Sequence, residues 1–251
     1  MKKFITISLF VFFMNSHNNL FAENYYKHAQ NALRQGHSTQ AMVYLNLNLK
    51  FLLEIDKKGS GKRDYELARV YRLLGHYDKA IAVHSKALIK LSKGTYPKIL
   101  LYASTSAHYN GLGINYAMKG QYDKAIAFYK KSYAIDEKRL GPVSYFSARF
   151  YNNMGATLLS KGEIKKARLY LIKSLKIARK KLGPNHLYLS EIYYNLSRAF
   201  KPGENLKQAT LYATQAVSIA KLSRGLGPNH PNTKKYTEYL KHLKRKIIAK
   251  E

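Results

Sequence analysis

Apolar and small residues recur at intervals of three and four along most of the chain, the spacing that places side chains on one face of an α-helix. Near the middle of the chain, one such stripe spans 109–116 and a second spans 122–133, with Gly120 between them. A glycine between two amphipathic stretches favours a turn, so this segment predicts two helices packed as an antiparallel hairpin. The stripes consist of Tyr109, Leu112, Gly113 and Tyr116, and then Tyr122, Ala125, Ile126, Tyr129, Ser132 and Tyr133.

The hairpin pattern repeats along the chain. The segment GHYDKAIA at 75–82 recurs as GQYDKAIA at 120–127, more loosely at 162–167 and 203–209, and most weakly at 36–41. The matching alanines fall at positions 41, 80, 125, 167 and 209, at intervals of 39, 45, 42 and 42 residues. Leu-Gly-Pro triplets at 140–142, 182–184 and 226–228 separate the later units. The glycine of each triplet suits a helix C-terminus and the proline cannot continue the helix. A period of this length predicts stacked repeats.

These repeats resemble tetratricopeptide repeats, in the longer form of about 42 residues found in kinesin light chain and its bacterial relatives. The resemblance implies an all-α, right-handed superhelical solenoid of antiparallel helix pairs, with about eleven helices in this chain. We expect a divergent first repeat and linker at 23–62, four tetratricopeptide-like repeats at 63–230 and a C-terminal capping helix at 231–251. The matching segments are YNGLG at 109–113, YNNMG at 151–155, YYNL at 193–196, and LGPNH at 182–186 and 226–230.

The first 22 residues have the layout of a secretory signal peptide. Lys2 and Lys3 precede an apolar run of 11 residues from Phe4 to Met14, and we place cleavage after Ala22. Eleven helical residues rise about 17 Å, which is too short for a hydrocarbon core of about 30 Å. The mature chain has no second apolar run long enough to span a membrane. We therefore expect a bacterial protein that is exported, either to the periplasm or out of the cell.

The composition is strongly basic. The 251 residues include 44 Lys and Arg against 14 Asp and Glu, for a formal charge of +30, yet 46% are hydrophobic. That apolar content is too high for a disordered polycation, so the chain should fold. Two explanations of the charge stay open. A field of this size attracts nucleic acid or anionic polymers, whereas a lysine-rich proteome would produce the same excess without any ligand.

The sequence contains few candidate catalytic or metal-binding residues. The absence of cysteine excludes disulfides, thiolate zinc sites and cysteine nucleophiles. The histidines form no H-E-x-x-H motif, and His186 and His230 occupy the same position in two linkers. Asp78 and Asp123 recur at the start of second helices, where a negative charge complements the helix dipole. We predict no catalytic residues, no metal site and no cofactor, and thus a protein that is not an enzyme.

In the resembled family, the first helix of each repeat lines a concave groove that binds peptides through Asn and basic side chains. An Asn side chain both donates to and accepts from a peptide backbone, and Arg can hold a carboxylate with two hydrogen bonds. An alternative is that the Asn side chains only bond to neighbouring helices. The resemblance implies that the groove is lined by Arg69, Arg72, Asn110, Arg149, Asn152, Asn153, Tyr194, Asn195, Arg198, Tyr239 and His242.

The sequence supports two hypotheses about function. The first is a non-catalytic exported scaffold that binds a protein or peptide, expected to be acidic, in the concave groove. The second is a basic protein that binds nucleic acid or an anionic envelope polymer by surface electrostatics. The sequence makes no prediction about the oligomeric state.

Overall fold

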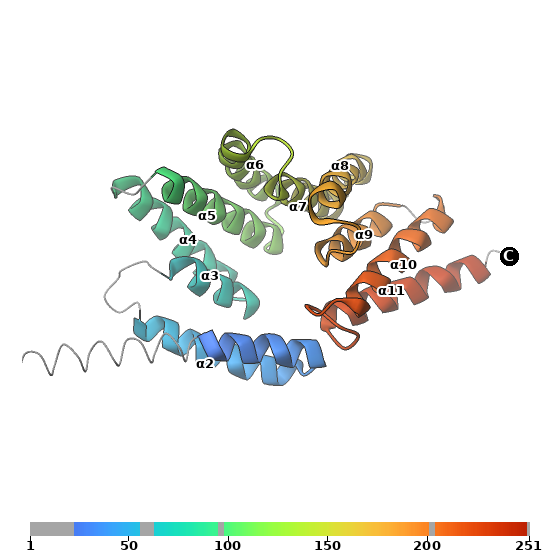
Figure 1. Ribbon diagram of the computed structural model, residues 1–251, viewed down its shortest axis with the longest axis horizontal. Helices are drawn as coiled ribbons and strands as arrows, with labels where there is room; N and C mark the ends of the chain where they lie inside the picture. Colours follow the sequence, from blue (N-terminus) through green and yellow to red (C-terminus); the bar gives the residue numbers. More distant parts are fainter. Residues whose placement is uncertain (1–22, 56–62, 95–97, 201–203, 250–251) are drawn as a thin grey trace, which may run out of the picture.

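The computed structural model describes residues 23–55, 63–94, 98–200 and 204–249 (Figure 1). These residues form eleven helices and no strand, as predicted. The predicted signal peptide at 1–22 and the linker at 56–62 lie outside the described residues. The helices are 23–35, α2 (Ser38–Ile55), α3 (Asp64–Leu73), α4 (Tyr77–Lys93), α5 (Lys98–Met118), α6 (Tyr122–Leu140), α7 (Tyr145–Lys161), α8 (Ile164–Leu182), α9 (Tyr188–Arg198), α10 (Leu206–Leu222) and α11 (Pro231–Ile248).

The predicted glycine turns separate the two helices of each hairpin. Gly162 ends α7 in the left-handed conformation, with φ of 87°, and the C-terminal cap closes with backbone hydrogen bonds to the carbonyls of Leu158 and Leu159. A residue with a Cβ atom rarely adopts this conformation, which is why glycine marks the turn. Gly120 has a φ of 75° in the corresponding turn between α5 and α6. The sequence signal for the hairpin therefore rests on backbone geometry.

Small residues bring the paired helices close together. A Cβ atom added at Gly155 in α7 would lie 2.5 Å from Cγ of Leu171 in α8, so the leucine packs directly on the α7 backbone. Ser174 Oγ of α8 donates a 2.7 Å hydrogen bond to the carbonyl oxygen of Ala148 in α7. Leu171, Ser174 and Ala148 are all fully buried. The largest hydrophobic core cluster extends from α7 through α11.

A buried histidine pair joins α4 to α5. Nδ1 of His84 and Nδ1 of His108 lie 2.9 Å apart, and the two side chains are 3% and 6% exposed. His84 occupies the repeat position that Tyr129 fills in the next hairpin. Gly111 makes room for it, because an added Cβ would lie 2.2 Å from His84 Nε2. Burial lowers the pKa of His84 to about 3 and of His108 to about 4, and the charges of His108 and Arg72 also lower the pKa of His84.

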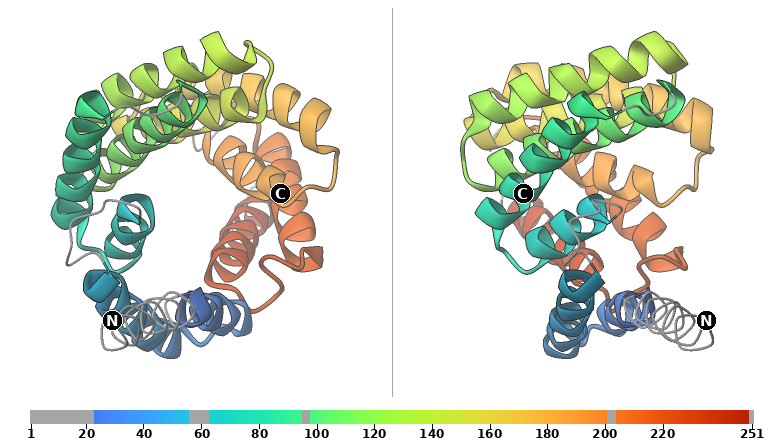
Figure 2. Two further views of the ribbon diagram at one scale, coloured as in Figure 1. Left: turned by 60° about the vertical axis from the view of Figure 1, so that its left-hand side comes forward. Right: turned by 90° about the vertical axis from the view of Figure 1, so that its left-hand side faces the viewer.

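Successive hairpins curve around a common axis, with the first helix of each hairpin on the inner side (Figure 2). The curvature brings the first hairpin beside the linker that precedes α11. Arg34 Nε donates a 3.4 Å hydrogen bond to the carbonyl oxygen of Gly225. A Cβ added at Gly36 would lie 2.7 Å from the carbonyl oxygen of Asn229. The two ends of the solenoid therefore touch across 191 residues of sequence.

The last helix, α11, packs against α10 and has no partner helix after it. Pro231 occupies its first turn, and the His230 side chain caps the helix by accepting a 3.1 Å hydrogen bond from the Asn232 backbone N–H. Tyr236 and Leu243 of α11 are buried. Within the described part of the chain, no helix has the length and hydrophobicity needed to cross a bilayer.

Candidate functional site

A cavity of about 430 Å³ opens on the inner face of the solenoid. Its lining comes from the first helices α3, α5, α7 and α9, together with Tyr129 of α6. Three of the residues predicted from the sequence lie in this lining: Arg72, Arg149 and Asn153. We refer to this cavity as the central groove.

The predicted asparagines bond to one another from helix to helix. Asn153 Nδ2 of α7 donates to Asn110 Oδ1 of α5 at 2.9 Å. Asn195 Nδ2 of α9 donates to Asn152 Oδ1 of α7 at 3.1 Å, and Asn152 Nδ2 donates to Glu191 Oε1 at 2.9 Å. Asn110, Asn152 and Asn195 are buried, whereas Asn153 is half-buried and faces the central groove. All four amides bond within the protein, and a partner can reach only that of Asn153, which keeps further hydrogen-bonding capacity beyond its bond to Asn110.

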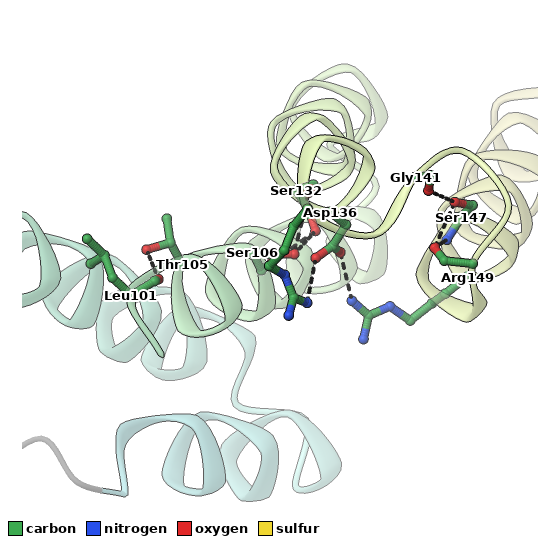
Figure 3. Close-up of polar contacts among 10 residues, drawn as sticks. Leu101, Thr105, Ser106, Ser132, Asp136, Gly141, Ser147 and Arg149 are labelled. Carbon is green, nitrogen blue, oxygen red and sulfur yellow. Dashed lines mark hydrogen bonds and ion pairs between the residues drawn. The ribbon is translucent and has the colours of Figure 1, made fainter. Parts of the chain in front are cut away.

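A buried carboxylate positions Arg149 in the central groove. Asp136 of α6 is 2% exposed, and its two oxygens lie 3.7 Å from Arg149 Nη2 and 3.6 Å from Arg139 Nη2 (Figure 3). The Arg149 guanidinium also lies 4.9 Å from the centre of the Phe146 ring. Because a guanidinium carries five N–H donors, this ion pair fixes the side chain and leaves donors available to a ligand.

Arg72 brings a second cation to the central groove. It is half-buried and forms no ion pair with another described residue. Burial lowers its pKa, and the neighbouring charge of Arg69 adds to this effect. The nearest counter-charge in the lining is Glu191, which is exposed within the groove. Desolvation by the surrounding protein raises the pKa of the Glu191 carboxyl. The hydrogen bond from Asn152 and the charges of Lys235 and Arg72 lower this pKa, but by less.

Tyr188 contributes to the groove wall. Its hydroxyl is buried, and the Asn152 side chain lies close enough to influence it. Burial raises the pKa of this hydroxyl well above its ordinary value, so it stays protonated and can donate. The sequence analysis did not single out Tyr188 or Glu191. Both lie at the start of α9, directly after a linker, where no periodic signal separates a groove residue from a capping residue.

The remaining predicted residues lie in two other places. Arg69 is exposed, lies 4.7 Å from the centre of the Tyr26 ring, and lines a cavity of about 300 Å³ with Glu23 and Glu66 near the first hairpin. This cavity is separate from the central groove.

The third group lies near the C-terminus. Tyr194 is 7% exposed and stacks on Tyr236 with ring centres 4.4 Å apart. The Arg198 guanidinium lies 5.6 Å from the centre of the Tyr194 ring. Arg198, Tyr239 and His242 line a further cavity of about 300 Å³. The structure therefore divides seven of the predicted residues among three cavities and does not bring them into one continuous row. The other four, Asn110, Asn152, Tyr194 and Asn195, are buried and line none of these cavities.

No group of three or more His, Asp or Glu side chains among residues 23–55, 63–94, 98–200 and 204–249 is placed to hold a metal ion.

Family models described as tetratricopeptide repeat match residues 65–95, 105–144 and 146–221, which together make up more than half of the chain. The chain belongs to the tetratricopeptide repeat family. The matched segments include every residue that lines the central groove. No curated protein matches this tetratricopeptide repeat protein by sequence.

Solved structures of similar shape include kinesin-light-chain-like repeat proteins. BtubC (BKLC) from P. vanneervenii is 16% identical, with a TM-score of 0.55, over 92% of this chain and 91% of that chain. A putative kinesin light chain from Podosopora anserina is 20% identical, with a TM-score of 0.53, over 84% of this chain and 98% of that chain. The apo form of RapI is 18% identical, with a TM-score of 0.55, over 91% of this chain and 85% of that chain. At these identities, the similarity establishes the fold alone.

Proposed function

We propose that this tetratricopeptide repeat protein is a non-catalytic scaffold that binds an acidic segment of a partner protein in its central groove. The fold is typical of protein interaction scaffolds, and the groove supplies the chemistry. Arg72 and Arg149 bring two cations to one cavity, and Asn153 and Tyr188 add polar groups beside them. The observation that carries the proposal is the placement of two guanidinium groups, those of Arg72 and Arg149, in the lining of one cavity.

A carboxylate suits these donors better than a neutral group does. Guanidinium groups bind carboxylates through paired, charge-assisted hydrogen bonds. Asn153, with its side chain partly accessible, can bond to the peptide backbone next to that carboxylate. The formal charge of +30 would draw acidic segments toward the protein over a longer range.

We also propose that the protein is bacterial and reaches its partner outside the cytoplasm. The layout of residues 1–22 supports export. Sequencing the N-terminus of the protein isolated from a bacterial host tests this point. A mature chain that begins at Glu23 is expected, and an intact Met1 in the cell envelope fraction would refute export by cleavage.

A peptide selection tests the groove. We expect peptides selected from a random library to carry Asp or Glu at a fixed position, and to lose binding when that residue is changed to Asn or Gln. The variant R72Q/R149Q should bind the selected peptides about tenfold more weakly or worse.

The matched control is K86Q/K207Q, which removes two charges from exposed positions outside the groove. It should bind the peptides like the wild type, apart from a small loss of long-range attraction. Selected peptides without acidic residues, or equal losses in R72Q/R149Q and K86Q/K207Q, would show that the groove does not recognise a carboxylate.

A further inference from the structure

Three acidic side chains lie at one edge of the solenoid, where the glycine turns lie. Asp78 and Asp123 begin the second helices α4 and α6, and Glu163 precedes α8. Lys119 forms an ion pair with Asp78, and Lys161 Nζ lies 2.6 Å from Asp123 Oδ1 and 3.3 Å from Glu163 Oε1. The first two pairs join consecutive hairpins, so Lys119 and Lys161 are neutralised within the protein.

The opposite edge carries cations without such partners. The second helices of stacked hairpins run in the same direction, so their C-terminal ends lie at one edge (Figure 1). Basic side chains gather there in the last turns of α6, α8 and α10 and in the linker after α10. Those exposed to solvent, which form no ion pair with another described residue, are Lys138, Arg179, Lys180, Lys181, Lys221 and Arg224. We name these six residues the basic ridge.

The few acids near the basic ridge do not neutralise it. Asp136 is buried and paired with Arg139 and Arg149. Glu137 accepts a 2.7 Å hydrogen bond from the Tyr133 hydroxyl. The last turns of α8 and α10 contain no acidic residue.

The helix dipole accounts for only part of this arrangement. One cation in the last turn complements the partial negative charge of a helix C-terminus. Three consecutive cations at 179–181 repel one another, as do the cations of neighbouring hairpins, and the protein supplies no acid to offset this. A row of unpaired charges that repeats from hairpin to hairpin matches a ligand with regularly spaced anionic groups.

We propose that the basic ridge binds a linear acidic polysaccharide. Such a chain can follow successive hairpins and place a carboxylate or sulfate near each group of cations, with release of its counterions. Single-stranded nucleic acids bind largely by stacking their bases on aromatic rings. The ridge segments 138–140, 179–182 and 221–224 contain no aromatic residue, and Leu140 and Leu222 are the exposed apolar side chains among them. This composition favours an anionic chain without bases.

Binding of labelled fragments of polygalacturonate and heparin to the full chain tests the proposal. We expect affinity to fall by about tenfold or more between about 50 and 200 mM salt, as for other ligands held by several ion pairs. The variant R179Q/K180Q/K181Q/K221Q should bind at least about tenfold more weakly and show a shallower dependence on salt. Circular dichroism spectra and Tm values establish that each variant is folded.

The matched control is K86Q/K130Q/K165Q/K207Q, which removes the same charge from exposed positions on second helices away from the ridge. It should keep most of the affinity. Equal losses in the two variants would refute a localised site. Tighter binding of DNA than of polysaccharide at matched charge and salt, lost in the ridge variant, would overturn the assignment to a polysaccharide.

The groove variant R72Q/R149Q separates this proposal from the preceding one. It should bind polysaccharide normally while losing the acidic peptides, and the ridge variant should show the reverse. Loss of both ligands in both variants would contradict the existence of two separate sites.

Discussion

Replacing Gly155 with alanine tests how closely α7 and α8 must approach. The new Cβ would lie 2.5 Å from Leu171 Cγ, 2.7 Å from Leu171 Cδ2 and 3.2 Å from the carbonyl oxygen of Ala167. Leu171 and Ala167 are fully buried, so the leucine cannot swing into solvent. Overpacking of this kind costs about 1–3 kcal/mol, and contacts this short place the cost near the upper end.

The intrinsic helix propensity of alanine opposes the clash. Alanine is more favourable than glycine in a helix interior by about 1 kcal/mol. The net loss of unfolding free energy is therefore about 2 kcal/mol, which lowers Tm by about 4–8 °C in a chain of this length. Thermal and urea unfolding followed by circular dichroism measure both quantities.

A double-mutant cycle tests whether contact with Leu171 causes the loss of stability in G155A. L171A alone should cost about 3–5 kcal/mol, because it leaves a cavity in a buried site. In G155A/L171A, the alanine at 155 enters the space vacated by the leucine, so the double variant should lose less stability than the two single variants together, by about 1 kcal/mol or more. A G155A variant as stable as the wild type, or strict additivity, would refute the reasoning.

Two further predictions concern the solenoid ends and the histidine pair. Gly36 has a φ of 82° and an added Cβ would lie 2.7 Å from the carbonyl oxygen of Asn229, so G36A should lower Tm more than G75A, where φ is 80° and no atom lies within 4 Å of an added Cβ; equal losses in the two variants would mean that the ends do not touch. In the folded protein, the pKa of His84 is lowered from 6.5 to about 3 and that of His108 to about 4. The unfolded chain therefore binds more protons than the folded protein between about pH 6.5 and 4, so the free energy of unfolding should decrease on acidification through this range. A Tm that does not fall over this pH range, or that falls equally in H84Q/H108Q, would contradict the assignment.

The sequence predicts the hairpins well because their signals are local. Gly120 and Gly162 have the left-handed conformations that their positions between two helical stripes indicate. The Leu-Gly-Pro triplets likewise mark helix ends, since α6 ends at Leu140 and α8 at Leu182. Turn chemistry and helical periodicity are properties of neighbouring residues, so one sequence suffices to recognise them.

The site is harder to predict because it depends on the offset between hairpins. Asn153 bonds to Asn110 and Asn195 bonds to Asn152, each 43 residues away, although the repeat in this region is 42 residues long. Asn153 and Asn195 occupy equivalent positions of their repeats and make equivalent hydrogen bonds, yet Asn195 is buried whereas Asn153 is half-buried and lines the groove. The sequence places all four asparagines on similar helix positions and contains nothing local that separates Asn153 from the other three.

The contact between Gly36 and Asn229 makes the number of repeats a fixed quantity in this protein. An open solenoid can gain or lose a unit during evolution, because each unit depends only on its immediate neighbours. Here the ends meet because the rotations between all successive hairpins add up to bring them together. Deleting or duplicating one unit would keep the interfaces between neighbouring hairpins but would move the two ends apart. Selection on the closed form would therefore act on the length of the array, a property that no single residue encodes.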